Sequence, residues 1–137
     1  MTKQATGMNS NIKQNRERAI NRYIAAYNAF DVEGMLEQLA DDVVFINRSN
    51  GAVTLKTDGK AAFREQAAAA CRYFSEREQT ITSWTFDGPK VTVNISYRAI
   101  VAIDLPNGMH AGDLLELDGN SEFKFVGERI IRIVDTA

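Results

Sequence analysis

The sequence predicts one α+β domain, with helices in its first half and a mainly antiparallel sheet in its second half. Before Glu76 the apolar residues recur at helical spacing, whereas after Glu76 they alternate with polar residues. No repeat, linker or low-complexity segment interrupts the 137 residues, a length typical of one domain. We therefore expect a single core in which the helices cover one face of a bent sheet.

Three helices are predicted by apolar stripes and by capping residues. The first spans residues 12 to 29, and Asp31 is a plausible N-cap for a shorter second helix. The pair Asp58-Gly59 opens the third helix. The apolar stripes comprise Ile20, Tyr23, Ile24 and Tyr27, then Val32, Met35, Leu36 and Leu39, then Phe63, Ala67, Ala70, Cys71 and Phe74.

The remaining segments read as strands. VVFIN and AVTLK, joined by the turn-rich RSNG, predict a short hairpin between the second and third helices. In KVTVNISYRAIVAID the apolar residues alternate, as in a long strand with one buried face. The apolar phase slips between Ile81 and Trp84, which predicts a β-bulge, and Gly119 suggests a bulge or bend in the next strand. The segment GERIIRIVDTA forms the last strand.

Composition and charge argue against several classes of protein. The net charge of −2 offers no field for nucleic acid or an anionic membrane. Residues 1 to 11 contain no apolar run, so we expect a disordered extension and a cytoplasmic protein rather than a signal peptide. Cys71 is the only cysteine, which excludes an internal disulfide. Because HxH, ExxH, CxxC and nucleotide-binding glycine motifs are missing, we expect no metal and no cofactor.

The stretches RYIAAYNAFDVEGMLEQLADDVVF, GKAAFRE and LDGNSEFKFVGERIIRIVDTA carry a family resemblance. They resemble the SnoaL-like and ketosteroid-isomerase-like branch of the nuclear transport factor two-like superfamily, over nearly the whole chain from Ile20. The resemblance implies a cone-shaped, cystatin-like α+β barrel in residues 12 to 137. In such a barrel, three N-terminal helices pack on a strongly curved, mixed and mostly antiparallel sheet around a deep apolar pocket.

The resemblance also suggests site residues. Tyr23 matches the tyrosine that holds the oxyanion in ketosteroid isomerases, but the base position falls on Asn47 and the partner acid on Ser121. An amide cannot act as a general base near neutral pH, so an ordinary ketosteroid isomerase is not expected. We expect instead a SnoaL-like protein that binds a small, largely apolar molecule. It is either an isomerase, cyclase or hydrolase using acid–base chemistry, or a non-catalytic dimeric interaction module or ligand carrier.

Two groups of residues are candidates for the site. Asp113, Asp135 and His110 are potential acids or bases at the rim, although an aspartate at a strand end is usually solvated. Core packing is the alternative role for Tyr23, Tyr27 and Trp84. The expected pocket-lining residues are Tyr23, Tyr27, Phe45, Asn47, Phe63, Trp84, Tyr97, Ser121 and Phe123.

A homodimer is also expected, through the outer face of the sheet. Ile100, Val126, Ile130 and Val134 fall on the parity opposite the predicted core. Outward aliphatic side chains on neighbouring strands would be unfavourable in a monomer.

Overall fold

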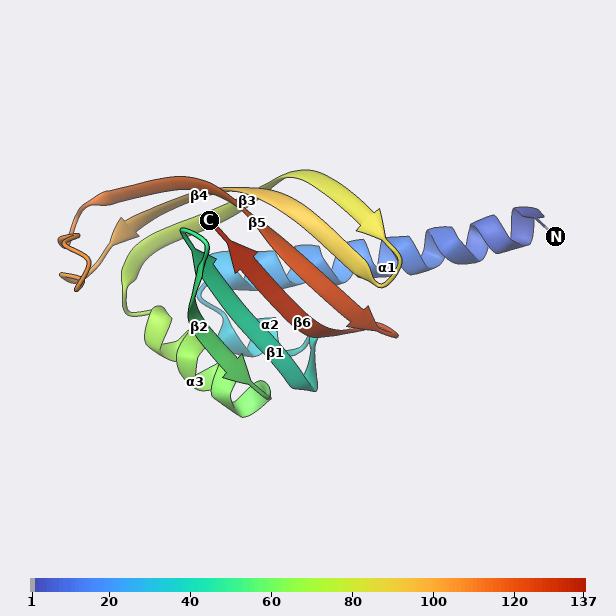
Figure 1. Ribbon diagram of the computed structural model, residues 1–137, viewed down its shortest axis with the longest axis horizontal. Helices are drawn as coiled ribbons and strands as arrows, with labels where there is room; N and C mark the ends of the chain where they lie inside the picture. Colours follow the sequence, from blue (N-terminus) through green and yellow to red (C-terminus); the bar gives the residue numbers. More distant parts are fainter. Residues whose placement is uncertain (1) are drawn as a thin grey trace.

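The computed structural model describes the chain from residue 2 to residue 137, and the side chains from residue 11 onward. Three helices pack against one mixed sheet, so the predicted α+β class is confirmed (Figure 1). The helices are α1 (Thr2–Asn28), α2 (Val32–Leu36) and α3 (Lys60–Ala70). The strands are β1 (Leu39–Ser49), β2 (Ala52–Asp58), β3 (Phe74–Asp87), β4 (Lys90–Val101), β5 (Leu114–Val126) and β6 (Arg129–Thr136).

The six strands have the order β2-β1-β6-β5-β4-β3. All neighbours pair antiparallel except β1 and β6, which pair parallel. The predicted hairpin of VVFIN and AVTLK is formed by β1 and β2. The parallel pair places the end of the chain beside β1, which brings residues far apart in the sequence onto adjacent strands.

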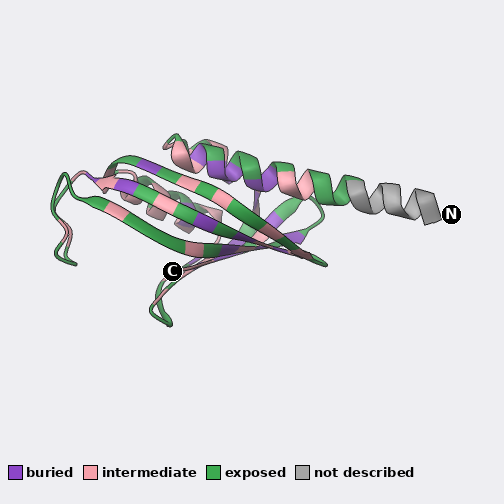
Figure 2. Cartoon of the chain, turned by 90° about the horizontal axis from the view of Figure 1, so that it is seen from above, coloured by how far each residue is buried: buried purple, intermediate pink, exposed green. Residues whose placement is uncertain are grey.

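The core lies between α1 and the inner face of the sheet. Ile20, Tyr23 and Ile24 are buried on one face of α1, as the helical spacing predicts. Figure 2 shows this buried stripe on the side of the helix that faces the strands. Phe123 and Phe125 of β5 are almost completely enclosed opposite it. Burying each such side chain contributes about 1.5–3 kcal/mol, so α1 is held mainly by this apolar contact.

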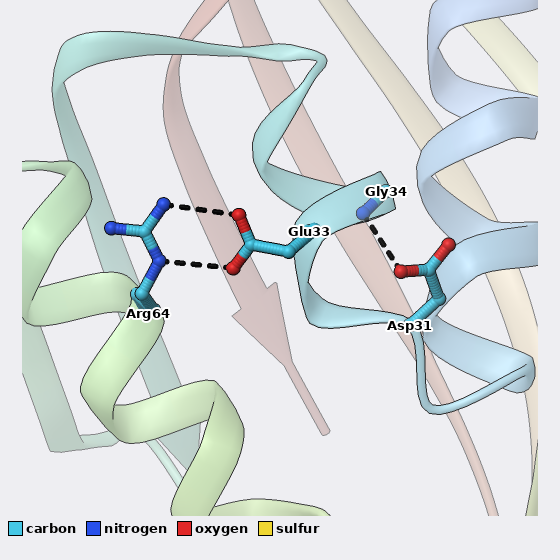
Figure 3. A network of polar contacts seen from close by, with 4 residues as sticks. All are labelled: Asp31, Glu33, Gly34 and Arg64. Carbon is cyan, nitrogen blue, oxygen red and sulfur yellow. Dashed lines mark hydrogen bonds and ion pairs between the residues drawn. The ribbon is translucent and has the colours of Figure 1, made fainter.

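A tight connection turns the chain from α1 into α2. The Asp31 carboxylate accepts a hydrogen bond from the backbone N–H of Gly34 at 3.0 Å, which confirms the predicted N-cap (Figure 3). A Cβ atom at Gly34 would lie 2.4 Å from Oδ2 of Asp31, so a side chain there would disturb the cap. The Arg64 guanidinium of α3 donates two hydrogen bonds to the Glu33 carboxylate, which ties α2 to α3 at the surface.

Register shifts decide which side chains face inward. The bulge predicted near Ile81 is confirmed, because the pairing of β3 with β4 shifts between Ile81 and Ser83. Gly119, by contrast, pairs regularly with Ile95, so no bulge occurs there in the pairing with β4. A Cβ atom on Gly119 would lie 2.5 Å from the backbone oxygen of Thr136. Glycine is required at this position because β5 and the end of β6 approach each other closely.

The outer face of the sheet is less apolar than the sequence suggested. Ile130 belongs to the core and is 0% exposed, because the pairing of β5 with β6 shifts between Lys124 and Phe125 and turns it inward. Val134 is also buried, whereas Val126 is 63% exposed and Ile100 is half-buried. Two of the four residues on which the predicted dimer depended are therefore buried. The dimer through this face stays a prediction.

Two further expectations concern the chain as a whole. The first helix was predicted to begin at residue 12, after a disordered extension of residues 1 to 11, whereas α1 begins at Thr2. The side chains are described only from residue 11 onward, and disorder of the extension stays a prediction. Among the described residues, no helix combines the length and the apolar character needed to cross a membrane.

Candidate functional site

A cavity of about 400 Å³ lies between the helices and the inner face of the sheet. Its wall is mainly apolar, with two aromatic rings, Phe45 and Phe63, in an edge-to-face contact at 5.6 Å between centroids. The helices contribute Tyr23, Tyr27, Met35, Phe63, Gln66, Ala67 and Ala70. The strands contribute Phe45, Asn47, Leu55, Arg77, Gln79, Ile95, Tyr97, Leu115, Leu117, Ser121 and Asp135, among others. Such a cavity has the size and polarity of a small-molecule site.

Three neighbouring strands bring Asn47, Ser121 and Asp135 together on the cavity wall. Asp135 of β6 pairs with Asn47 of β1 on one side and with Ser121 of β5 on the other. The Ser121 hydroxyl donates a hydrogen bond to the Asp135 carboxylate at 2.6 Å. The Asn47 amide donates to the Thr54 hydroxyl of β2 at 2.8 Å. The side chains of Asn47 and Ser121 are therefore engaged by the protein, and the group between them is the carboxyl group of Asp135.

The Asp135 carboxyl group has an environment that favours its protonated form. Burial raises the pKa of Asp135 from its ordinary value of 3.8 to about 6, and the hydrogen bond from Ser121 opposes this rise. A carboxyl group with a pKa near 6 exists in both forms close to neutral pH. It can take a proton from a ligand or return one.

Tyr23 lies on the same wall and has an unused hydroxyl group. The side chain is 4% exposed, and its ring contacts Phe123 edge-to-face at 5.7 Å between centroids. The Tyr23 hydroxyl makes no hydrogen bond within the described part of the chain. It is also not one of the fully enclosed polar atoms without a partner, which among the described residues belong to Arg16, Thr57 and Gln79. The hydroxyl therefore meets the open space of the cavity. It combines the two roles left open by the sequence, since its ring packs in the core and its hydroxyl lines the cavity.

A pair of phenols, Tyr27 and Tyr97, forms another part of the cavity wall. The hydroxyl oxygens of Tyr27 and Tyr97 are 2.8 Å apart. Because one hydroxyl donates to the other, one proton of the pair stays free to donate to a ligand. Burial raises the pKa of Tyr23, Tyr27 and Tyr97 above the ordinary value of 10.0, so all three are protonated at neutral pH.

Arg77 is a site residue that sequence reasoning missed. It is only 6% exposed and lines the cavity from β3. Its Nε donates to the backbone oxygen of Tyr27 at 2.8 Å, and its guanidinium carbon lies 3.7 Å from the centre of the Tyr27 ring. The feature of the sequence that could have revealed Arg77 is the bulge near Ile81. The bulge shifts the pairing register of β3 by one residue, so Arg77 pairs with Ala99, which lies on the buried face of β4.

Four of the expected site residues lie elsewhere. Phe123 is 0% exposed in the core beneath Tyr23, and Trp84 stacks on Phe86 away from the cavity. Asp113 and His110 are exposed in the connection between β4 and β5, where the Asp113 carboxylate accepts from the backbone N–H of His110 at 2.7 Å. This connection does not contribute to the cavity wall. The other expected residues, Tyr23, Tyr27, Phe45, Asn47, Phe63, Tyr97, Ser121 and Asp135, line it together.

The acidic and sulfur side chains do not gather into a metal site. Among the described residues, no three His, Cys, Asp or Glu side chains lie where they could hold one ion. Asp135 has a serine, an asparagine and phenols around it instead. These neighbours suit hydrogen bonding to an organic ligand.

Comparisons with known proteins agree with this architecture. The family model described as SnoaL-like domain matches residues 20–133. A search of curated proteins found no match. Solved structures match over most of the chain, and at their low identity they show a shared fold.

Three crystal structures illustrate this similarity. A protein assigned as a SnoaL-like polyketide cyclase from Jannaschia sp. CCS1 has a TM-score of 0.77 at 13% identity, covering 90% of this chain and 85% of its own. A protein assigned as a polyketide cyclase from Xanthomonas campestris has a TM-score of 0.74 at 22% identity, with coverages of 90% and 92%. An uncharacterised cystatin-fold protein from Novosphingobium aromaticivorans has a TM-score of 0.67 at 23% identity, with coverages of 88% and 96%.

Proposed function

Because the chain belongs to the SnoaL-like domain family, we propose that its cavity binds a small, largely apolar molecule and catalyses proton transfer on it with Asp135. Proteins that share one fold can have different activities, so the activity is inferred from the residues of the site. The observation that carries the proposal is a partly buried carboxyl group, with a pKa of about 6, on the wall of an apolar cavity.

The proposed reaction needs no cofactor. The Asp135 carboxylate removes a proton from a carbon next to a ligand carbonyl group, and the carbonyl oxygen gains negative charge as the enolate forms. The neutral phenol of Tyr23 donates a hydrogen bond to that oxygen. Return of the proton to the same carbon gives hydrogen exchange, whereas its return to another carbon of a conjugated enolate yields isomerisation. Alternatively, the enolate carbon attacks a second carbonyl carbon within the ligand, and Asp135 gives its proton to the alkoxide that forms, which yields cyclisation.

The Ser121 hydroxyl has a positioning role in this proposal. Its hydrogen bond to Asp135 keeps the carboxyl group on the cavity wall and lowers its pKa against the effect of burial. The resemblance to ketosteroid isomerases places the base position on Asn47, whereas the base proposed here, Asp135, pairs with Asn47 from the adjacent strand β6.

The reaction is tested by hydrogen exchange into apolar ketones such as 2-tetralone in D₂O, followed by proton NMR. We expect the wild-type protein to accelerate exchange next to the carbonyl group, with a rate that rises up to about pH 6 and then levels off. Asp135→Asn should lower the rate by about 100-fold or more. Equal rates for the wild type and Asp135→Asn would refute the assignment of the base.

Filling the cavity provides an independent test of ligand binding. Ala67 of α3 lines the cavity, whereas Ala68 is exposed on the same helix. We expect Ala67→Phe to weaken the binding of apolar ligands by about 100-fold with little loss of stability, because the new ring enters empty apolar space. Ala68→Phe is the matched control and should bind as the wild type does. Calorimetric titration checks this, and unchanged affinity in Ala67→Phe would place the ligand outside the cavity.

A further inference from the structure

Arg77 carries a buried positive charge that no carboxylate in the described part of the chain neutralises. The side chain is 6% exposed, and within the described part of the chain it forms no ion pair with a carboxylate. Its neighbours are the rings of Tyr27 and Phe30, at 3.7 and 4.5 Å from the guanidinium carbon to the ring centres, and the Cys71 sulfur. A buried charge without a counter-ion is in general unfavourable.

Anchoring of α1 explains only part of this arrangement. Nε of Arg77 donates to the backbone oxygen of Tyr27 in the last turn of α1, where a cation is favourable, and Nη2 lies 3.8 Å from the Cys71 sulfur. A guanidinium group has five N–H donors, so these contacts leave several unused. Nη1 has no partner among the described residues and is not one of the fully enclosed atoms. Because Arg77 lines the cavity, its free donors are available to a ligand.

Gln79 adds a second unmet polar group to the same wall. It follows Arg77 by two residues on β3, so both side chains point to the same face of the sheet. Its Oε1 is enclosed and, within the described residues, makes no hydrogen bond. Its backbone is held by two hydrogen bonds with the Asn28 side chain, at 2.8 and 3.1 Å. The backbone is therefore fixed, whereas Oε1 of the side chain has no partner within the described part of the chain.

From these contacts we infer that the cavity takes an organic anion, an apolar body with one carboxylate or one equally acidic enol, whose negative oxygens bind to Arg77. Oε1 of Gln79 is an acceptor, so it suits a hydroxyl or N–H donor on the same ligand. This inference rests on the proposed function and names the class of its substrate. A planar guanidinium is complementary to two oxygens that share a charge, and the rings of Tyr27 and Phe30 hold it in place before binding.

The positions of the two charged groups agree with such a ligand. Asp135 is on β6 and Arg77 on β3, with β5 and β4 between them in the sheet. Both border one cavity, and both act on the Tyr23 and Tyr27 phenols: burial mainly raises the pKa of these phenols, Asp135 raises it further, and Arg77 opposes the rise. An elongated anion bound at Arg77 would place its far end near Asp135. The acidic group orients the molecule and stays separate from the carbon that reacts.

Matched aromatic acids and amides test the inference. Benzoate, 2-naphthoate and anthracene-2-carboxylate are compared with the corresponding amides by calorimetric titration at pH 7.5. We expect the wild type to bind the best acid at least about 10-fold more tightly than its amide, and Arg77→Met to remove this preference without weakening the amide more than about twofold. Arg77→Lys should keep part of the preference, because it keeps the charge but loses the planar group.

Controls separate this inference from a structural role and from the catalytic proposal. Arg16 also lies over an aromatic ring, Phe125, but does not line the cavity, so Arg16→Met should keep the acid preference. Asp135→Asn should keep or increase it. Equal binding of acid and amide by the wild type would overturn the anion inference alone, even if the Arg77 variants failed to fold. Binding of neither series would overturn it together with the proposed function.

Discussion

Asp135→Asn is expected to make the folded protein more stable above pH 6 while it removes the proton-transfer activity. The carboxyl group has a pKa of about 6 in the folded protein and about 3.8 when unfolded, so the folded state retains the proton more strongly. The favourable contribution of the protonated group is complete below pH 3.8 and is lost as the pH rises through 6. An asparagine stays neutral and still accepts the hydrogen bond from Ser121.

The size of this effect follows from the shift in pKa. Each pKa unit corresponds to about 1.4 kcal/mol, and we reduce the full value because Asp135 is partly open to the cavity. Urea unfolding of both proteins from pH 4 to pH 8 should show an advantage of the variant that grows to about 1–2 kcal/mol by pH 7. Asp118→Asn, which replaces an exposed carboxylate on β5, should show no such trend. A difference that is constant with pH would contradict the raised pKa.

Phe123→Ala is expected to cause the largest loss of stability. The Phe123 ring is 0% exposed and supports Tyr23 from below, so its removal leaves a void that the neighbouring strands cannot fill. The free energy of unfolding should fall by about 3–5 kcal/mol. Since Tyr23 loses its support, the affinity for apolar ligands should fall as well.

Phe45→Ala provides the matched comparison. Phe45 is half-buried on the cavity wall, so its ring already borders empty space and its removal enlarges an existing void. We expect a loss of at most half that of Phe123→Ala, measured by urea unfolding under the same conditions. If the two variants lost equal stability, Phe123 would have the same role as Phe45, and the distinction between core and cavity wall would be wrong.

Local patterns were sufficient to predict most of the fold. The helical stripe of Ile20, Tyr23 and Ile24, the Asp31 cap and the alternation in β4 each depend on neighbours within a few residues. The resemblance to SnoaL-like proteins added the arrangement of these elements. Eight of the twelve predicted site residues line the cavity, because their parity on a strand or helix places them on the inner face.

The chemistry of the site was harder to predict, since it depends on strand register. The bulge near Ile81 was predicted, but its consequence, that Arg77 turns toward the cavity, appears only when β3 pairs with β4. The resemblance placed the base position on Asn47 and the partner acid on Ser121, whereas only the pairing of β6 shows that Asp135 lies between them. Ile130 was assigned to the outer face because the shift at Lys124 was not visible in the apolar pattern.

The sequence by itself determined the α+β class, the family, the order of the elements and the apolar inner face, because these follow from periodicity and from residue types close together in the chain. Only the tertiary structure decided which polar groups meet. Asp135 and Ser121 are separated by 14 positions and Arg77 and Tyr27 by 50, and their contacts depend on parallel pairing, bulges and helix docking. The burial that raises the pKa of Asp135 and encloses the Arg77 side chain is a property of the assembled core.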